Sequence, residues 1–126
     1  MFPLDKAVWE RFVAKYGPMY LGFQYDITCG ITSTKYNALK EPYKSDATIL
    51  SKLRIDAVGE TETSIDIIEV KPRGNMASIG QLLTYKQHYI DEYKPAKSIR
   101  IVLVCADIDP NIIPLAEQNG IIYMVV

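Results

Sequence analysis

The segment Leu53–Lys71 reads LRIDAVGETETSIDIIEVK and decides the fold that the sequence predicts. Leu53–Val58 and Ser64–Lys71 are both rich in Ile and Val, residues that favour β-strands. The polar segment Gly59–Thr63 between them predicts a turn. We therefore expect a β-hairpin whose two strands lie side by side.

Charged side chains interrupt these otherwise apolar strands. Asp56 lies in the first strand, and Glu69 and Lys71 lie in the second. Because side chains alternate along a strand, Glu69 and Lys71 point to one face, and the hairpin brings Asp56 alongside them. Asp66 points to the opposite face, where we expect a structural role. A buried carboxylate without a partner is costly, and a divalent cation would offset that cost.

The pattern is typical of phosphodiester hydrolysis. The carboxylates of Asp56 and Glu69, together with the carbonyl oxygen of Val70, can hold Mg²⁺ or Mn²⁺ with waters still bound. Such an ion lowers the pKa of a bound water and neutralises charge that develops on the phosphate. Lys71 can orient the attacking water. An isolated Glu-x-Lys could instead be a surface ion pair, but Asp56 and the apolar flanks favour the metal site.

The front of the chain predicts a helix, a strand and an irregular segment. Leu4–Tyr16 has apolar residues at helical spacing, and Gly17-Pro18 ends the helix. Tyr20–Ile31 is rich in aromatic and β-branched residues and predicts a strand. Thr32–Lys52 mixes lysines, tyrosines and a proline, which indicates a loop or irregular excursion.

The back of the chain predicts alternating helices and strands. Pro72–Asn75 breaks the chain, and Ser78–Tyr93 is amphipathic and predicts a helix. Ile99–Ala106 is apolar apart from Arg100, as expected of a strand buried on both faces. Asp109-Pro110 caps a short helix that ends near residue 120, and Ile121–Val126 is a last strand. We predict one α/β domain over residues 1–126, with a mixed central β-sheet flanked by helices in the order α-β-β-β-α-β-α-β.

The composition is that of an ordinary globular protein, with 48% hydrophobic and 23% charged residues among 126. The net charge of -1 excludes a bulk polycation, so a nucleic-acid partner has to be argued from local charge. We expect Cys29 and Cys105 to be buried thiols in a reducing compartment. No signal peptide or membrane span is visible. A cytoplasmic protein follows, or a viral protein in a host cytoplasm.

Three motifs resemble those of the PD-(D/E)XK nuclease superfamily. Asp56 is followed after twelve residues by Glu69-Val70-Lys71, similar to the D-x(n)-E-x-K signature, although Ile55 replaces the proline of the family name. Gln81–Tyr85 reads QLLTY, similar to the Q-x-x-x-Y motif of the RecB-like branch. Glu10 is similar to a helical acidic position of RecB-like nucleases and Holliday-junction resolvases. The resemblance covers residues 5–105.

The resemblance implies a restriction-endonuclease-like core and a deoxyribonuclease that depends on Mg²⁺ or Mn²⁺ and leaves 5′-phosphate ends. It implies that Asp56, Glu69, Val70 and Glu10 bind metal and that Lys71 positions the water. Gln81 and Tyr85 lie four residues apart on one helical face and would line the site. Endonuclease and exonuclease action both stay open. So does a non-catalytic nucleic-acid-binding or assembly module that keeps the fold.

Basic residues near these motifs predict a phosphate-binding rim, with a solvated charged loop as the alternative. Tyr36 and Tyr43 could stack on bases, whereas we expect Trp9 in the core. DNA is the expected partner, and the chain could act as a homodimer or as a subunit of a larger nuclease complex. The sequence does not separate DNA from RNA or single from double strands. The residues of the predicted rim are Lys44, Lys52, Arg54, Arg73 and Lys86.

Overall fold

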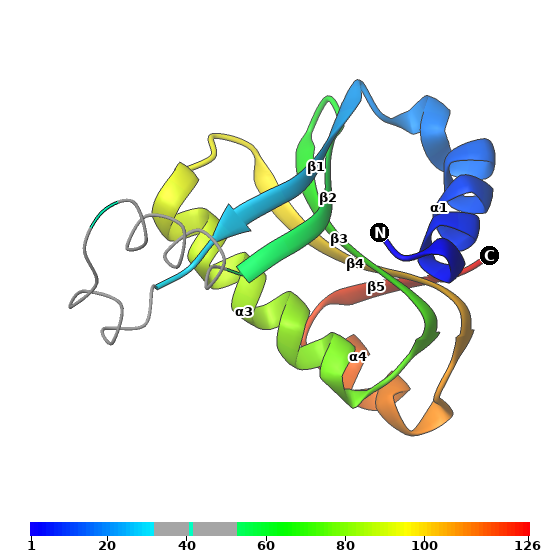
Figure 1. Cartoon of the computed structure of the whole chain (residues 1–126). Helices are drawn as coiled ribbons and strands as arrows, with labels where there is room; N and C mark the ends of the chain where they lie inside the picture. Colours follow the sequence, from blue (N-terminus) through cyan, green and yellow to red (C-terminus); the bar gives the residue numbers. More distant parts are fainter. Residues whose placement is uncertain (32–40, 42–52) are drawn as a thin grey trace.

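Five strands form one mixed sheet in the order β1-β2-β3-β4-β5 (Figure 1). The structure is a computed structural model that describes residues 1–31, 41 and 53–126. The pairs β1-β2 and β2-β3 are antiparallel, and the pairs β3-β4 and β4-β5 are parallel. This confirms the mixed α/β sheet predicted from the sequence. The strands are β1 (Gly22–Cys29), β2 (Leu53–Glu60), β3 (Ser64–Gly74), β4 (Ser98–Ile108) and β5 (Ile121–Val125).

Helices cover both faces of the sheet, as Figure 1 shows. One hydrophobic cluster joins α1 to the sheet, and the second joins α3 and α4 to the opposite face. The element order α-β-β-β-α-β-α-β is the predicted one. No helix of the described ranges is both long and apolar enough to cross a membrane. The helices are α1 (Pro3–Tyr16), α3 (Met76–Tyr93) and α4 (Ile113–Gln118), with 3₁₀ turns η1 (Gly17–Met19) and η3 (Pro110–Ile112).

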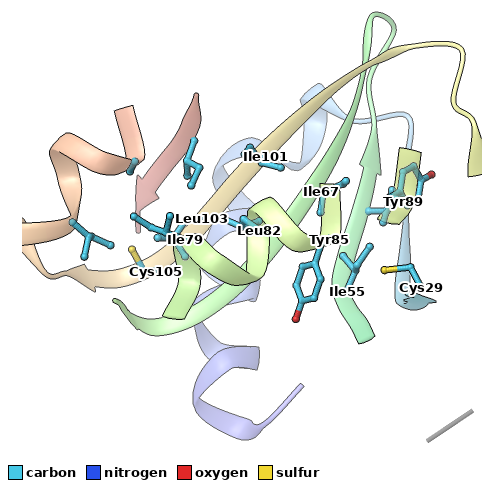
Figure 2. Packing of buried hydrophobic residues seen from close by; sticks show 14 residues of the cluster. Cys29, Ile55, Ile67, Ile79, Leu82, Tyr85, Tyr89, Ile101, Leu103 and Cys105 are labelled. Carbon is cyan, nitrogen blue, oxygen red and sulfur yellow. The ribbon is translucent and has the colours of Figure 1, made fainter. Parts of the chain in front are cut away.

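The cluster beneath α3 is the larger of the two (Figure 2). Ile67, Leu82, Ile101 and Leu103 are all almost inaccessible to solvent. Each such aliphatic side chain contributes roughly 1.5–3 kcal/mol when buried. The central residues of β4, from Ile101 to Cys105, are buried on both sides, which confirms the prediction from their apolar run.

Trp9 and both cysteines lie where the sequence predicted. Trp9 is 6% exposed and belongs to the α1 cluster. Cys29 and Cys105 are buried and form no disulfide. Burial raises the pKa of the Cys105 thiol, so the neutral form is favoured there.

The predicted break at Pro72–Asn75 is wrong, because β3 continues to Gly74. Its parallel pairing with β4 extends past the proline, with Arg73 opposite Asp107 and Gly74 opposite Ile108. A Cβ at Gly74 would lie 2.8 Å from Leu103 Cδ2, so a larger residue at this position would require the Leu103 side chain to shift. Helix α3 then begins two residues before the predicted start.

The start of α3 is set by a capping box. The Asn75 side chain accepts a hydrogen bond from the Ser78 backbone N–H at 3.2 Å, and Ser78 Oγ accepts one from the Asn75 N–H at 3.2 Å. These two bonds satisfy backbone donors that the first turn of a helix would otherwise leave unpaired. The cap therefore fixes where α3 begins relative to the end of β3.

Candidate active site

The sheet is irregular where Asp56 and Asp26 lie opposite each other. Tyr25 pairs with Ala57 and Ile27 pairs with Ile55, but Asp26 has a φ of 53° and its pairing with Asp56 is interrupted. Left-handed backbone is tolerated by aspartate better than by most residues. As a result Tyr25 and Ala57 face α1, whereas Ile27 and Ile55, two residues away, face α3.

Asp56 also ends the pairing between β2 and β3. The register of these strands runs from Glu60 opposite Ile65 to Ala57 opposite Ile68 and stops there. Beyond this point Asp56 Oδ2 accepts the Val70 backbone N–H at 2.9 Å. One carboxylate oxygen of Asp56 therefore accepts the hydrogen bond that a backbone carbonyl of β2 would accept in a regular sheet. This bond holds the Asp56 side chain where the pairing of β2 with β3 ends.

Glu69 is a buried acid with an unsatisfied oxygen. Its residue exposure is 4%, its Oε1 lies 3.7 Å from Lys71 Nζ, and its Oε2 makes no hydrogen bond with any described residue. Burial, followed by the charge of Asp56, raises the pKa of Glu69 to about 8. Burial also raises the pKa of Asp56, and the charge of Asp5 adds to this effect. Two neighbouring acids are thus held where a cation would stabilise their charged forms.

These groups open into a cleft of about 390 Å³. Its lining brings together seven residues that the sequence predicted, contributed by β2, β3 and α3: six of the catalytic and metal site and Arg54 of the basic rim. Two acids that the sequence analysis did not select, Asp5 and Asp26, line it as well, and Glu10 does not. The lining residues are Met1, Phe2, Asp5, Asp26, Arg54, Asp56, Glu69, Val70, Lys71, Gln81 and Tyr85.

Helix α1 presents Asp5, and not Glu10, to the cleft. Asp5 lies in the first turn of α1 and is half-buried, whereas Glu10 is exposed. An acid in a first turn is common because it complements the helix dipole, so no sequence feature distinguishes Asp5 as a site residue. Asp26 has no sequence signal beyond the tolerance of aspartate for its backbone conformation.

Helix α3 supplies Gln81 and Tyr85 from successive turns. Tyr85 is 7% exposed, and Figure 2 shows its ring within the core cluster and its hydroxyl at the margin of that cluster. Burial, then the charges of Glu69 and Asp56, raises the Tyr85 pKa above its usual range, so its hydroxyl stays a hydrogen-bond donor. The buried Oε1 of Gln81 makes no hydrogen bond within the described ranges.

The predicted basic rim is only partly assembled at the cleft. Arg54 is exposed and lines it. Arg73 is exposed and pairs with Asp107 at 3.4 Å, and Lys86 is half-buried on α3 without lining the cleft. Lys44 and Lys52 lie outside the described residues, as do Tyr36 and Tyr43.

The donor set fits a hydrated divalent cation better than a fully protein-coordinated one. Residues 1–31, 41 and 53–126 contain no group of three His, Cys, Asp or Glu side chains arranged to hold a metal ion. Magnesium, however, is usually bound through one or two carboxylates with several waters retained. Asp56 and Glu69 supply two, and both line the same cleft.

No protein-family model and no curated protein sequence matches the chain. Solved structures do share its fold. The EndoMS structure in complex with double-stranded DNA superposes with a TM-score of 0.58 at 16% identity, over 100% of this chain and 46% of that one. A repair endonuclease from Pyrococcus abyssi gives 0.57 at 14% identity, over 96% of this chain and 46% of that one.

A third structure, of a protein of unknown function, gives a TM-score of 0.52 at 12% identity, over 95% of this chain and 56% of that one. The chain therefore spans about half the length of these proteins. At such low identity the likeness concerns the fold alone, and membership of the PD-(D/E)XK superfamily stays a prediction. The chain has the fold found in the EndoMS structure and in the repair endonuclease from Pyrococcus abyssi.

Proposed function

We propose that the chain is a nuclease that hydrolyses phosphodiester bonds in DNA with Mg²⁺ or Mn²⁺ and leaves 5′-phosphate ends. The observation that carries this proposal is the state of Glu69. It is buried and its Oε2 has no hydrogen-bond partner among the described residues, yet Asp56 and Lys71 lie beside it in an open cleft. Burial disfavours the charged form of Glu69, and a bound cation would stabilise that form.

Asp66, three residues earlier in β3, provides the contrast within the same strand. It is fully buried, and both of its oxygens accept hydrogen bonds, from Ser64, Tyr20 and Arg100, at 2.6–2.8 Å. A structural acid in this fold is therefore fully satisfied. Glu69 has no comparable set of donors: its Oε1 lies 3.7 Å from Lys71 Nζ, its Oε2 has no donor among the described residues, and its other neighbour is the acid Asp56.

The position of each residue in the cleft suggests its role. Asp56, Glu69 and the Val70 carbonyl would hold the cation, which, when bound, supplies an activated water and neutralises charge on the phosphate. Lys71 would orient the water with its ammonium group. Tyr85, which keeps its proton, would donate a hydrogen bond, and Arg54 at the margin would contact a neighbouring phosphate.

Two of the structural neighbours support DNA as the partner. Both share the fold, and EndoMS was solved with double-stranded DNA. The exposed guanidinium of Arg54 beside the acidic pair gives a phosphate group a cationic contact at the cleft. The proposal includes action as a homodimer or as a subunit of a larger nuclease complex.

A cleavage panel tests the proposal. Linear, circular, nicked, flapped and four-way-junction DNA are incubated with Mg²⁺ or Mn²⁺. We expect cleavage of at least one form and none in EDTA. Asp56→Asn, Glu69→Gln and Lys71→Ala should each reduce the rate by about 10²–10³-fold.

The matched control for these variants is Glu62→Gln, which changes an exposed acid in the hairpin turn. It should cleave like the wild type, and circular dichroism should show that all four variants are folded. Absence of cleavage on every substrate, or cleavage that the three site variants leave unchanged, would contradict the proposal.

A further inference from the structure

A second hollow, of about 320 Å³, adjoins the candidate active site. It shares Met1, Asp26 and Asp56 with the cleft, and the pairing of β1 with β2 is interrupted between Asp26 and Asp56. Its other walls are Lys6, Trp9 and Tyr25. The volume lies within the range of small-ligand pockets, roughly 300–1,000 Å³.

Tyr25 is the exposed aromatic residue in the lining of this hollow. Tyr25 is 49% exposed, whereas Trp9 beside it is 6% exposed. An exposed tyrosine on its own is unremarkable. Here, however, the ring stands next to Asp56, so a group that stacked on it would lie beside whatever the two acids bind.

The Tyr25 ring is held in place rather than free to move. Trp9 Nε1 donates a hydrogen bond to Tyr25 Oη at 3.2 Å, and the two rings meet edge to face at 5.8 Å and 89°. Trp9 is itself stacked on Phe12 at 5.2 Å, and Phe23 lies 6.4 Å from Tyr25. A ring that is already ordered loses little entropy when a ligand stacks on it.

The charged residues that line the hollow, Lys6 and Asp26, could bind the phosphate and the base of a nucleotide. The exposed Lys6 ammonium can contact a phosphate, and the exposed Asp26 carboxylate can accept a hydrogen bond from an exocyclic amino group of a base. Aromatic faces next to a cation are a common platform for the bases of single strands.

We infer that this hollow binds an unstacked nucleobase next to the phosphate held at Asp56, so that the preferred substrate is single-stranded or locally unpaired DNA. Bases inside a duplex are stacked on their neighbours and do not reach such a surface without being extruded. The inference rests on the proposed function, since it names the substrate class of the same site.

The test measures binding in EDTA, so that it does not depend on cleavage. Fluorescence anisotropy gives the affinities for a twelve-nucleotide single strand and for the corresponding duplex, about one turn of helix. We expect the single strand to bind about tenfold more tightly. Tyr25→Leu should lose about tenfold for the single strand only, and Tyr25→Phe, which keeps the ring, should stay within about twofold.

Tyr93→Leu is the matched control, because Tyr93 is 46% exposed and lies on α3 away from both spaces. It should leave both affinities unchanged. An abasic residue moved along the strand adds a test that needs no variant, since one position should weaken wild-type binding about tenfold. Equal affinity for the two DNA forms, no binding, or equal losses in Tyr25→Phe and Tyr25→Leu would overturn the inference.

The outcomes separate this inference from the proposed function. A protein that cleaves DNA but binds both forms alike, with or without Tyr25, keeps the nuclease proposal and loses the base-binding hollow. A protein that never cleaves but prefers single strands through Tyr25 keeps the hollow and loses the nuclease proposal.

Discussion

Two acids in β3 are buried for different reasons. The environment of Asp66 lowers its pKa, because burial is outweighed by hydrogen bonds from Arg100, Tyr20 and Ser64. Glu69 lies on the other face, where burial and the charge of Asp56 raise its pKa to about 8. The chain stabilises the first charge itself and leaves the second for a ligand to stabilise.

The raised pKa of Glu69 predicts how stability depends on pH without metal. Between about pH 4.5, its ordinary value, and pH 8 the folded protein binds more protons than the unfolded chain. Stability in EDTA should therefore fall as pH rises through this window, by on the order of 2 kcal/mol. Urea denaturation at several pH values measures it. Glu69→Gln should remove most of the fall and Glu62→Gln should not, and identical profiles for wild type and Glu69→Gln would contradict the assignment.

Asp5 and Glu10 offer a matched pair on one helix. Asp5 lines the cleft, and its charge adds to the effect of burial on the pKa of Asp56, whereas Glu10 is exposed and lies outside the lining. Asp5→Asn should therefore weaken Mn²⁺ binding about three- to tenfold, because one nearby negative charge is lost. Glu10→Gln should stay within about twofold. Calorimetric titration compares them, and a larger loss for Glu10→Gln would place the helical acid of the site at Glu10.

At the scale of elements, the site depends on where regular pairing stops. The ladder of β2 and β3 ends next to Asp56, and the ladder of β1 and β2 is interrupted at Asp26. The cleft and the neighbouring hollow open at this place. Helix α3 closes one wall of the cleft with Gln81 and Tyr85, from a start that the Asn75 cap fixes.

The sequence could predict the hairpin, the helix faces and the grouping of Asp56, Glu69 and Lys71, because these follow from side-chain periodicity. It could not predict that β3 passes through Pro72, since that depends on β4, which pairs alongside. Nor could it select Asp5, whose place in the cleft depends on how α1 crosses the sheet. The left-handed backbone at Asp26 likewise has no periodic signal.

The end of α3 predicts a stabilising substitution. Lys94, which follows the helix, has φ 45° and ψ 58°, a left-handed conformation in which glycine avoids the clash of Cβ with the backbone. Lys94→Gly should raise the free energy of unfolding by about 1 kcal/mol, measured by urea denaturation. Lys94→Ala removes the same charge but keeps Cβ, so it should not stabilise. Equal effects of the two variants would exclude backbone strain as the cause.

At the scale of the whole molecule, one polar network ties the front of the chain to the centre of the sheet. Tyr20, which follows η1, donates to Asp66 of β3 at 2.6 Å, and Arg100 of β4 donates to both oxygens of the same carboxylate at 2.6 and 2.8 Å. The network lies on the opposite face of β3 from Glu69. The fold is therefore held by one buried acid while the other remains available to the cleft.

This network predicts a large effect on stability. Asp66→Asn would leave Arg100 without its charged partner and Tyr20 with a weaker acceptor, so unfolding should become easier by about 3 kcal/mol. Glu60→Gln is the control, because Glu60 pairs with Lys97 at 2.8 Å on an exposed part of β2 and should cost under about 1 kcal/mol. Thermal and urea denaturation compare them. Similar costs for the two variants would show that the buried network is not central to stability.

The central claim is that Asp56 and Glu69 together bind a divalent cation beside Lys71, and calorimetric titration of the folded protein with Mn²⁺ tests it most directly. We expect saturable binding at one site or more that Asp56→Asn and Glu69→Gln each weaken at least tenfold. Lys71→Ala should leave binding intact or strengthen it, because a neighbouring positive charge is removed. No binding by the folded wild type, or binding that both carboxylate variants retain, would contradict the claim.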